Sequence, residues 1–165
     1  MKIIFYCQYV WGMGHLFRSL ELARAFSEHQ VILIAGGREV DVRLPDHVSL
    51  VRLPGLYMDE QFTTLIPEEA GKTVDEIQRE RKDILFSLFE KHRPDILMIE
   101  LYPFGRTKFG FELKPLLEQI RQGLLEQLHQ QPTQDHVAQI TILGPCPGRC
   151  LQRLVQYPVL QVAQG

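Results

Sequence analysis

Two glycines and a histidine follow the first apolar run of the chain, within the stretch QYVWGMGHLFRSLELARAF (residues 8–26). Glycine lets a backbone turn sharply and pass close to a ligand. The first turn of a helix has unpaired N–H groups and a positive dipole end, which attract anions such as phosphates. We therefore predict a substrate- or phosphate-binding turn at Gly12, Met13 and Gly14, with a purely structural turn as the alternative.

His15 and Glu100 are the candidate catalytic residues. His15 directly follows the glycine turn, and an imidazole can act as a general base near neutral pH. Glu100 ends the apolar segment ILMIE (96–100), where a carboxylate could act as a base or bind a sugar hydroxyl. The alternatives are a histidine that only caps or packs the helix start and a strand-end acid that bonds to loop N–H groups.

Two common nucleotide-binding motifs do not fit this sequence. The dinucleotide fingerprint G-x-G-x-x-G needs a third glycine where the chain has Phe17. It also needs an acid near the end of the second strand, where the chain has Gly36, Gly37 and Arg38. No G-K-[ST] follows the glycines, which excludes a P-loop. We therefore expect no nicotinamide, flavin or other cofactor.

The segment YPFGRTKFGF (102–111) is a second candidate binding element. It combines aromatic rings, Tyr102 among them, with the cations Arg106 and Lys108. Rings and cations together could stack on a glycan or lipid-linked acceptor and contact its phosphate. The alternative is a packed loop whose charges are solvated.

The three cysteines predict neither a disulfide framework nor a metal site. Cys146 and Cys150 stand in CPGRC, with His129 and His136 upstream, and all four are residue types that bind zinc. Their spacing differs from the usual C-x-x-C knuckle, so we expect no metal. Cys7 is expected to be a small buried apolar residue of the first strand.

Length and composition indicate one globular domain. The 165 residues are 45% hydrophobic and 23% charged, and the net charge of −2 gives no reason to expect nucleic acid as a partner. No apolar run approaches the ~20 residues that span a bilayer. We expect no transmembrane segment, which leaves peripheral membrane contact open. The N-terminal run lacks a signal-peptide cleavage site, and cysteines are few, so a cytoplasmic location is expected.

Alternating strand and helix signals predict an α/β fold, a single Rossmann-like open parallel sheet with helices on both faces. We expect strands at 3–7, 31–37, 48–55, 96–101, 137–143 and 158–163, helices from residue 14 onward and at 74–92, 111–122 and 148–156, and a long loop at 56–72. We divide the chain into a Rossmann-like domain at 1–122 and a C-terminal extension at 123–165 that could complete the sheet.

Two segments resemble the N-terminal half of GT-B glycosyltransferases. They are MKIIFYCQYVWGMGHLFRSLELARAF with the following VILIAGG, and RPDILMIELYPFGRTKFGFELKPLL, which is similar to a predicted bacterial glycosyltransferase group. The nearest group is the family 28 line, which includes the lipid-linked peptidoglycan GlcNAc-transferase. The resemblance covers roughly residues 1–122.

The resemblance implies an acceptor-side domain of an enzyme that transfers a hexosyl group from a nucleotide-sugar, without a metal. It places Gly12, Gly14 and His15 near the donor phosphates and the acceptor hydroxyl, with His15 as base or orienter. Gly36 and Gly37 would close the neighbouring strand end. Glu100 and the 102–108 loop would face the same cleft.

In that family a second domain of ~150 residues binds the donor, and residues 123–165 do not resemble it. We expect a fragment, a chain with a diverged end, or a half-enzyme that pairs with a donor-binding subunit. The alternative function is a non-catalytic binding or scaffold subunit that recruits such a partner. Another nucleotide-binding Rossmann protein is less favoured, because the third glycine is missing.

Overall fold

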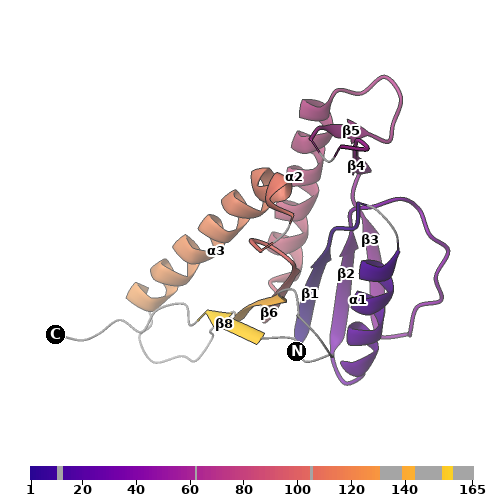
Figure 1. Ribbon diagram of the computed structural model, residues 1–165. Helices are drawn as coiled ribbons and strands as arrows, with labels where there is room; N and C mark the ends of the chain where they lie inside the picture. Colours follow the sequence, from indigo (N-terminus) through magenta and orange to yellow (C-terminus); the bar gives the residue numbers. More distant parts are fainter. Residues whose placement is uncertain (11–12, 62, 105, 131–138, 144–153, 158–165) are drawn as a thin grey trace.

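The computed structural model describes residues 1–10, 13–61, 63–104, 106–130, 139–143 and 154–157, with side chains up to residue 123. In this part of the chain a six-stranded sheet has the order β3-β2-β1-β6-β7-β8 (Figure 1). Its strands are β1 (Lys2–Cys7), β2 (Gln30–Ala35), β3 (Val48–Arg52), β6 (Ile96–Glu100), β7 (Gln139–Leu143) and β8 (Leu154–Tyr157). The helices are α1 (Gly14–Ala25), α2 (Val74–His92) and α3 (Gly110–Gln130), with a short 3-10 turn η1 (Thr107–Phe109) before α3.

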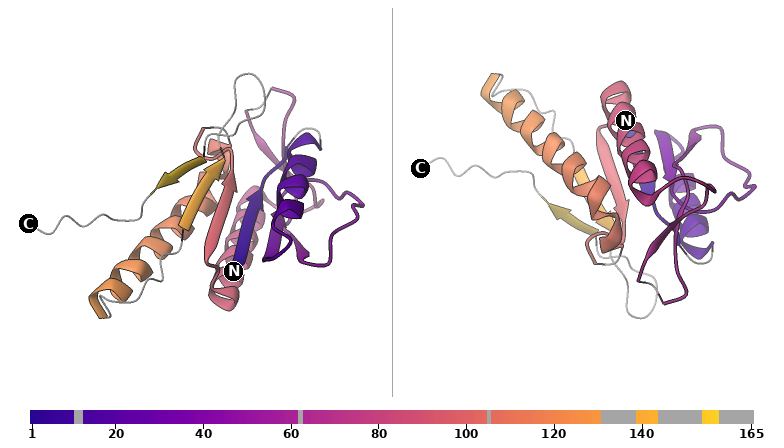
Figure 2. Two further views of the ribbon diagram at one scale, coloured as in Figure 1. Left: turned by 90° about the horizontal axis from the view of Figure 1, so that it is seen from below. Right: turned by 90° about the horizontal axis from the view of Figure 1, so that it is seen from above.

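The central strands are buried on both faces, as their continuous apolar sequences predict. In β1, Ile3 and Phe5 face α1 and pack in one cluster with Leu16 and Leu20. The alternate residues, such as Ile4, pack in a second cluster with buried side chains of α2 and α3. The sheet therefore separates α1 from α2 and α3 (Figure 2). The predicted α/β class, with helices on both faces of a mostly parallel sheet, is confirmed.

The strand order is that of a Rossmann-like sheet. β3, β2, β1, β6 and β7 pair in parallel in that order. The chain adds strands on one side of β1 and then returns to its other side at β6. The carboxyl ends of β1 and β6 therefore flank the topological switch point, where open α/β sheets bind ligands.

Two element predictions are wrong, and one edge strand departs from the parallel arrangement. The expected loop at 56–72 contains a hairpin of β4 (Leu56–Met58) and β5 (Leu65–Pro67), whose three-residue strands are too short to show a period. The sheet is not wholly parallel, because β8 pairs antiparallel with β7. Residues 154–156, expected to be helical, belong to β8, where the backbone groups pair with a neighbouring strand.

Other boundaries differ less. α2 has the expected bounds, and a capping box between Thr73 and Glu76 fixes its start. α3 extends past its expected end and runs through residue 122 without a break. The expected strand at 158–163 lies outside the described residues. Where the structure describes the chain, no helix has the length and apolar character to cross a membrane.

A buried ion pair ties the carboxyl ends of the strands together. Arg81 of α2 and Glu112 of α3 are both fully buried, and Arg81 Nε lies 2.8 Å from Glu112 Oε2. Arg81 also donates to the side chain of Gln8 after β1, at 2.7 Å, and to the carbonyl of Pro54 after β3, at 2.8 Å. The Tyr6 hydroxyl donates to the same Glu112 carboxylate.

The two buried donors to Glu112 keep their protons in the core. Burial alone would lower the pKa of Arg81, but the charge and hydrogen bonds of Glu112 outweigh it, and the pKa is raised. Burial raises the pKa of Tyr6, and Glu112 raises it further, so the hydroxyl stays a donor. Arg81 therefore stays charged and Tyr6 keeps its proton, and both donate to the Glu112 carboxylate.

Replacing Arg81 with methionine should lower the free energy of unfolding by about 3–5 kcal/mol, because Glu112 would stay buried without its counter-charge. Urea denaturation followed by circular dichroism measures the loss. Arg79→Met, at an exposed position of the same helix, is the matched control and should change stability by no more than about 0.5 kcal/mol. Equal stability of the two variants would contradict this role of the ion pair.

Candidate functional site at the switch point

His15 and Glu100 meet at the switch point between β1 and β6. Glu100 is the last residue of β6, and His15 is the second residue of α1, which follows β1. His15 Nδ1 lies 3.0 Å from Glu100 Oε1. Directly after Glu100, Leu101 has a φ of 62°, a left-handed conformation that is unusual for a branched residue. The chain thus turns away sharply and leaves the carboxylate directed toward α1.

Glu100 is buried, with 1% of its side chain exposed, and five donor groups surround its carboxylate. Oε1 accepts from Arg18 Nε at 3.0 Å and from Arg18 Nη2, in addition to His15. Oε2 accepts from Cys7 Sγ at 3.2 Å and from Ser19 Oγ at 3.4 Å. Three of these partners lie on α1 at positions i, i+3 and i+4, so one face of that helix is bonded to the end of β6.

These contacts set the protonation of Glu100 and Cys7. Burial alone would raise the pKa of Glu100, but hydrogen bonds from His15, Arg18 and Cys7 outweigh it, and the pKa is lowered. Burial raises the pKa of the Cys7 thiol, and the charge of Glu100 raises it further, so the thiol keeps the proton that it donates. Glu100 is thus an ionised acceptor near neutral pH.

An ionised Glu100 determines which nitrogen of His15 carries the proton. A carboxylate only accepts, so His15 Nδ1 must hold the hydrogen that bonds to Oε1. Arg18 Nη2 lies 2.9 Å from the same nitrogen but finds its acceptor in Glu100. The lone pair of the neutral imidazole is then on Nε2. The His15 side chain as a whole is 29% exposed.

The other predicted site residues lie in different environments. Met13 is the exposed residue before α1, and Gly14 begins the helix, with nothing within 4 Å of the position that a Cβ would occupy. Gly12 lies outside the described residues.

Arg106 is half-buried and donates from Nε to the carbonyl of Gln8 at 2.9 Å. Tyr102 is buried in the cluster beneath α2 and α3, and the structure does not bring it to Glu100.

Gly36 and Gly37 have a packing role within the chain. Both are buried, and a Cβ at Gly36 would lie 1.8 Å from the side-chain oxygen of Gln8. At Gly37 a Cβ would lie 2.2 Å from the ring of Tyr9. The absence of a side chain at these two glycines therefore leaves room for Gln8 and Tyr9, which follow β1.

The sequence analysis did not identify Arg18 and Ser19 as partners of Glu100. Their i+3 and i+4 spacing from His15 places them on the same face of α1. Every helix has residues at these spacings, so the spacing alone could not show that this face lies against the end of β6. Cys7 was expected to be a plain apolar residue, and its bond to Glu100 corrects that view. The side chains of His129, His136, Cys146 and Cys150 lie outside those that the structure describes.

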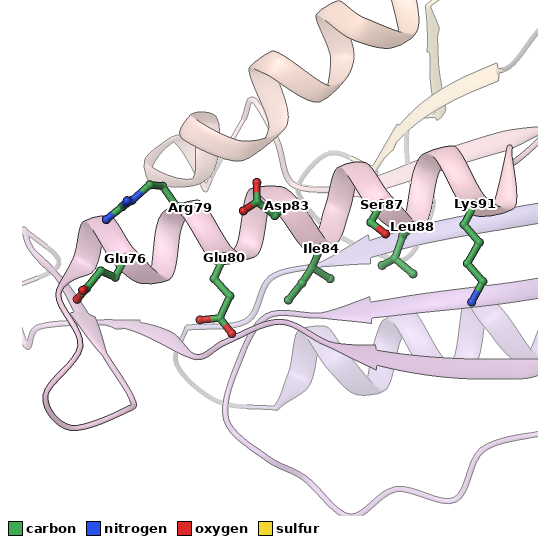
Figure 3. A pocket seen from close by; sticks show the side chains of 8 residues that line it. All are labelled: Glu76, Arg79, Glu80, Asp83, Ile84, Ser87, Leu88 and Lys91. Atoms are coloured by element: carbon green, nitrogen blue, oxygen red, sulfur yellow. The ribbon is translucent and has the colours of Figure 1, made fainter.

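A concave region runs along α2 and has a cavity volume of about 760 Å³. Its lining alternates charges of both signs, such as Glu80 and Lys91, with the aliphatic Ile84 and Leu88 (Figure 3). It contains neither His15 nor Glu100. All of its lining residues belong to α2, and none is among the predicted site residues, so the switch point is kept as the candidate site.

Comparisons with known proteins found similar solved structures at low sequence identity. No family model matches the sequence, and no curated protein matches it either. Similar solved structures include UGT2 from Phytolacca americana (20% identity, TM-score 0.40) and a UDP-glucosyltransferase from Polygonum tinctorium that glucosylates indoxyl (15%, 0.42). A third is a UGT transferase from Siraitia grosvenorii in complex with UDP (12%, 0.38). Each alignment covers 68% of this chain but only 26–27% of the other, so the chain spans about a quarter of their length.

The free energy of unfolding should decrease as the pH falls from about 4.5 downward. The lowered pKa of Glu100 means that the unfolded chain binds this proton more readily, so stability that is present at higher pH is lost in acid. Glu100→Gln removes this contribution and should make the decrease smaller. Urea denaturation of both proteins at about pH 6 and at lower pH values measures the difference.

The matched control for this experiment is Glu21→Gln, which removes an exposed carboxylate from α1. It should leave the pH dependence close to that of the unchanged chain, because its ion pair with Arg24 is exposed to solvent. A Glu100→Gln protein with the full acid sensitivity of the original chain would refute the assignment of this carboxylate.

Proposed function

We propose that this chain is the acceptor-side half of a glycosyltransferase that moves a hexosyl group from a nucleotide-sugar, with His15 as the general base. The observation that carries the proposal is the contact of His15 Nδ1 with the buried Glu100, at 3.0 Å, at the topological switch point. The resemblance of the Gly-His turn to the family 28 line, and of the 93–117 segment to a predicted bacterial glycosyltransferase group, supports the reaction class.

The proposed reaction is a direct displacement at the anomeric carbon. An acceptor hydroxyl gives its proton to Nε2 of His15 as its oxygen forms a bond to the anomeric carbon. The bond between that carbon and the diphosphate oxygen breaks, and the nucleoside diphosphate leaves with the electron pair. Glu100 holds the ring through Nδ1–H and stabilises the imidazolium that forms.

The remaining predicted residues have binding roles in this proposal. The N-terminus of α1 after Gly12, Met13 and Gly14 would face the diphosphate, since no described side chain caps this helix end. Arg106 would add a positive charge. The resemblance favours a glycan or lipid-linked acceptor in the cytoplasm and a donor-binding domain in cis or in a partner subunit. Gly36, Gly37 and Tyr102 would then shape the surrounding strand ends rather than react.

His15→Ala should reduce turnover by about 10²–10⁴-fold, the usual cost of losing a general base. The assay measures nucleoside-diphosphate release with the chain alone and with a donor-binding glycosyltransferase half supplied in cis or in trans. The melting temperature of the same variant should change little, because the His15 side chain is partly exposed.

His47→Ala is the matched control. His47 bonds to the carbonyl of Ala23 near the far end of α1, at 3.0 Å, and should affect stability without affecting turnover per folded molecule. Full turnover in the His15→Ala protein would refute the catalytic role. Together with a lowered melting temperature, that result would favour the non-catalytic binding subunit, with His15 as a structural residue of the helix start.

A further inference from the structure

One oxygen of Glu100 has more donors than it needs. Oε1 accepts from Nε and Nη2 of Arg18 and from Nδ1 of His15, whereas a carboxylate oxygen has two lone pairs. If Arg18 left, Oε1 would keep His15, and Oε2 would keep Cys7 and Ser19. The carboxylate would therefore remain hydrogen-bonded at both oxygens.

Arg18 is the partner that can leave. Its side chain is 41% exposed, whereas Glu100 is 1% exposed and Cys7 is fully buried. An arginine side chain on a helix surface can change rotamer without disturbing the backbone. The guanidinium thus stands between a buried carboxylate and solvent.

The cluster also carries more positive than negative charge. Among the described residues, Arg106 forms no ion pair, and its one hydrogen bond is to the carbonyl of Gln8. Burial lowers the pKa of Arg106, the charge of Glu100 opposes this, and the charge of Arg18 adds to it. The charge of Glu100 therefore acts on Arg106 as well as on Arg18, which contacts it directly.

We propose that Arg18 is the binding residue for a diphosphate group, and that its guanidinium moves from Glu100 to this anion when a ligand enters. A planar guanidinium donates two parallel hydrogen bonds to phosphate oxygens. The added negative charge offsets the excess of Arg18 and Arg106. As Arg18 leaves, His15 becomes the sole donor to Oε1, so ligand entry leaves the existing His15–Glu100 pair without a competing donor. Only this last step rests on the proposed function.

Inorganic pyrophosphate is the probe, added to the full chain at low ionic strength. Isothermal titration should show binding that weakens about tenfold in Arg18→Gln. In the unchanged chain, the Arg18 Nε–H resonance in an ¹⁵N-correlated NMR spectrum should shift on titration, since Nε leaves Glu100. Arg24→Gln is the matched control, because Arg24 lies on the same helix and is paired with Glu21. It should bind pyrophosphate as the unchanged chain does.

Arg18→Lys keeps the charge and loses the two-donor geometry, so it should bind with intermediate affinity and serves if Arg18→Gln fails to fold. Equal pyrophosphate affinity in the unchanged chain and the Arg18 variants, or an Arg18 resonance that does not shift, overturns the proposal. Because no turnover is measured, this result is independent of the test of His15.

Two further ligands distinguish the source of the diphosphate. UDP represents a nucleotide donor, and farnesyl diphosphate represents a lipid-linked acceptor. Tighter binding of UDP than of pyrophosphate, with loss in Arg18→Gln, supports the proposal with a nucleotide source. If farnesyl diphosphate binds more tightly than pyrophosphate and loses this affinity in Arg18→Gln, the proposal is supported with a lipid-linked diphosphate as the ligand. If neither ligand depends on Arg18, the proposal is refuted for both.

Discussion

The Arg81 guanidinium is the constraint on which the arrangement of the strand ends depends. A buried cation is tolerated only when its N–H groups are paired, and Arg81 finds its acceptors on Glu112, on Gln8 and on the Pro54 carbonyl. These partners come from α3 and from the segments that follow β1 and β3. The penalty of leaving any of them unpaired favours a single geometry of the carboxyl edge, where the candidate site lies.

The buried carboxylates Glu100 and Glu112 are held in different ways. Glu112 is hydrogen-bonded to Arg81 and Tyr6, which are themselves buried. If Arg81 left Glu112, its guanidinium charge would remain in the core without a counter-charge. Glu100 is equally buried, but Arg18 and His15 reach it from the solvent side. The first arrangement fixes structure. The second presents an ionised carboxylate to groups that a ligand can approach, which is what a site needs.

Much of the fold could be predicted from local patterns, and part of the site could not. The sequence patterns of β1, β2 and α2 are clear because their buried positions must be apolar. β1 and β2 are continuous apolar runs, and α2 has a helical period. His15 and Glu100 could be selected because each follows or ends a strand. The donors Arg18 and Ser19 could not, since their role depends on β6 pairing with β1, a contact between segments about 90 residues apart. β4 and β5 were missed because three residues show no period.

The glycines show how one residue type serves two purposes at the same sheet edge. Gly36 lacks a Cβ where the side chain of Gln8 must pass, and Gln8 in turn bonds to Arg81. The small size of Gly36 therefore serves packing within the chain, because it makes room for the Gln8–Arg81 hydrogen bond at the strand ends. Gly14 has open space at the same position of its backbone. Packing within the described chain gives no reason for its missing side chain, and the ligand proposed to approach the start of α1, next to His15, would give one.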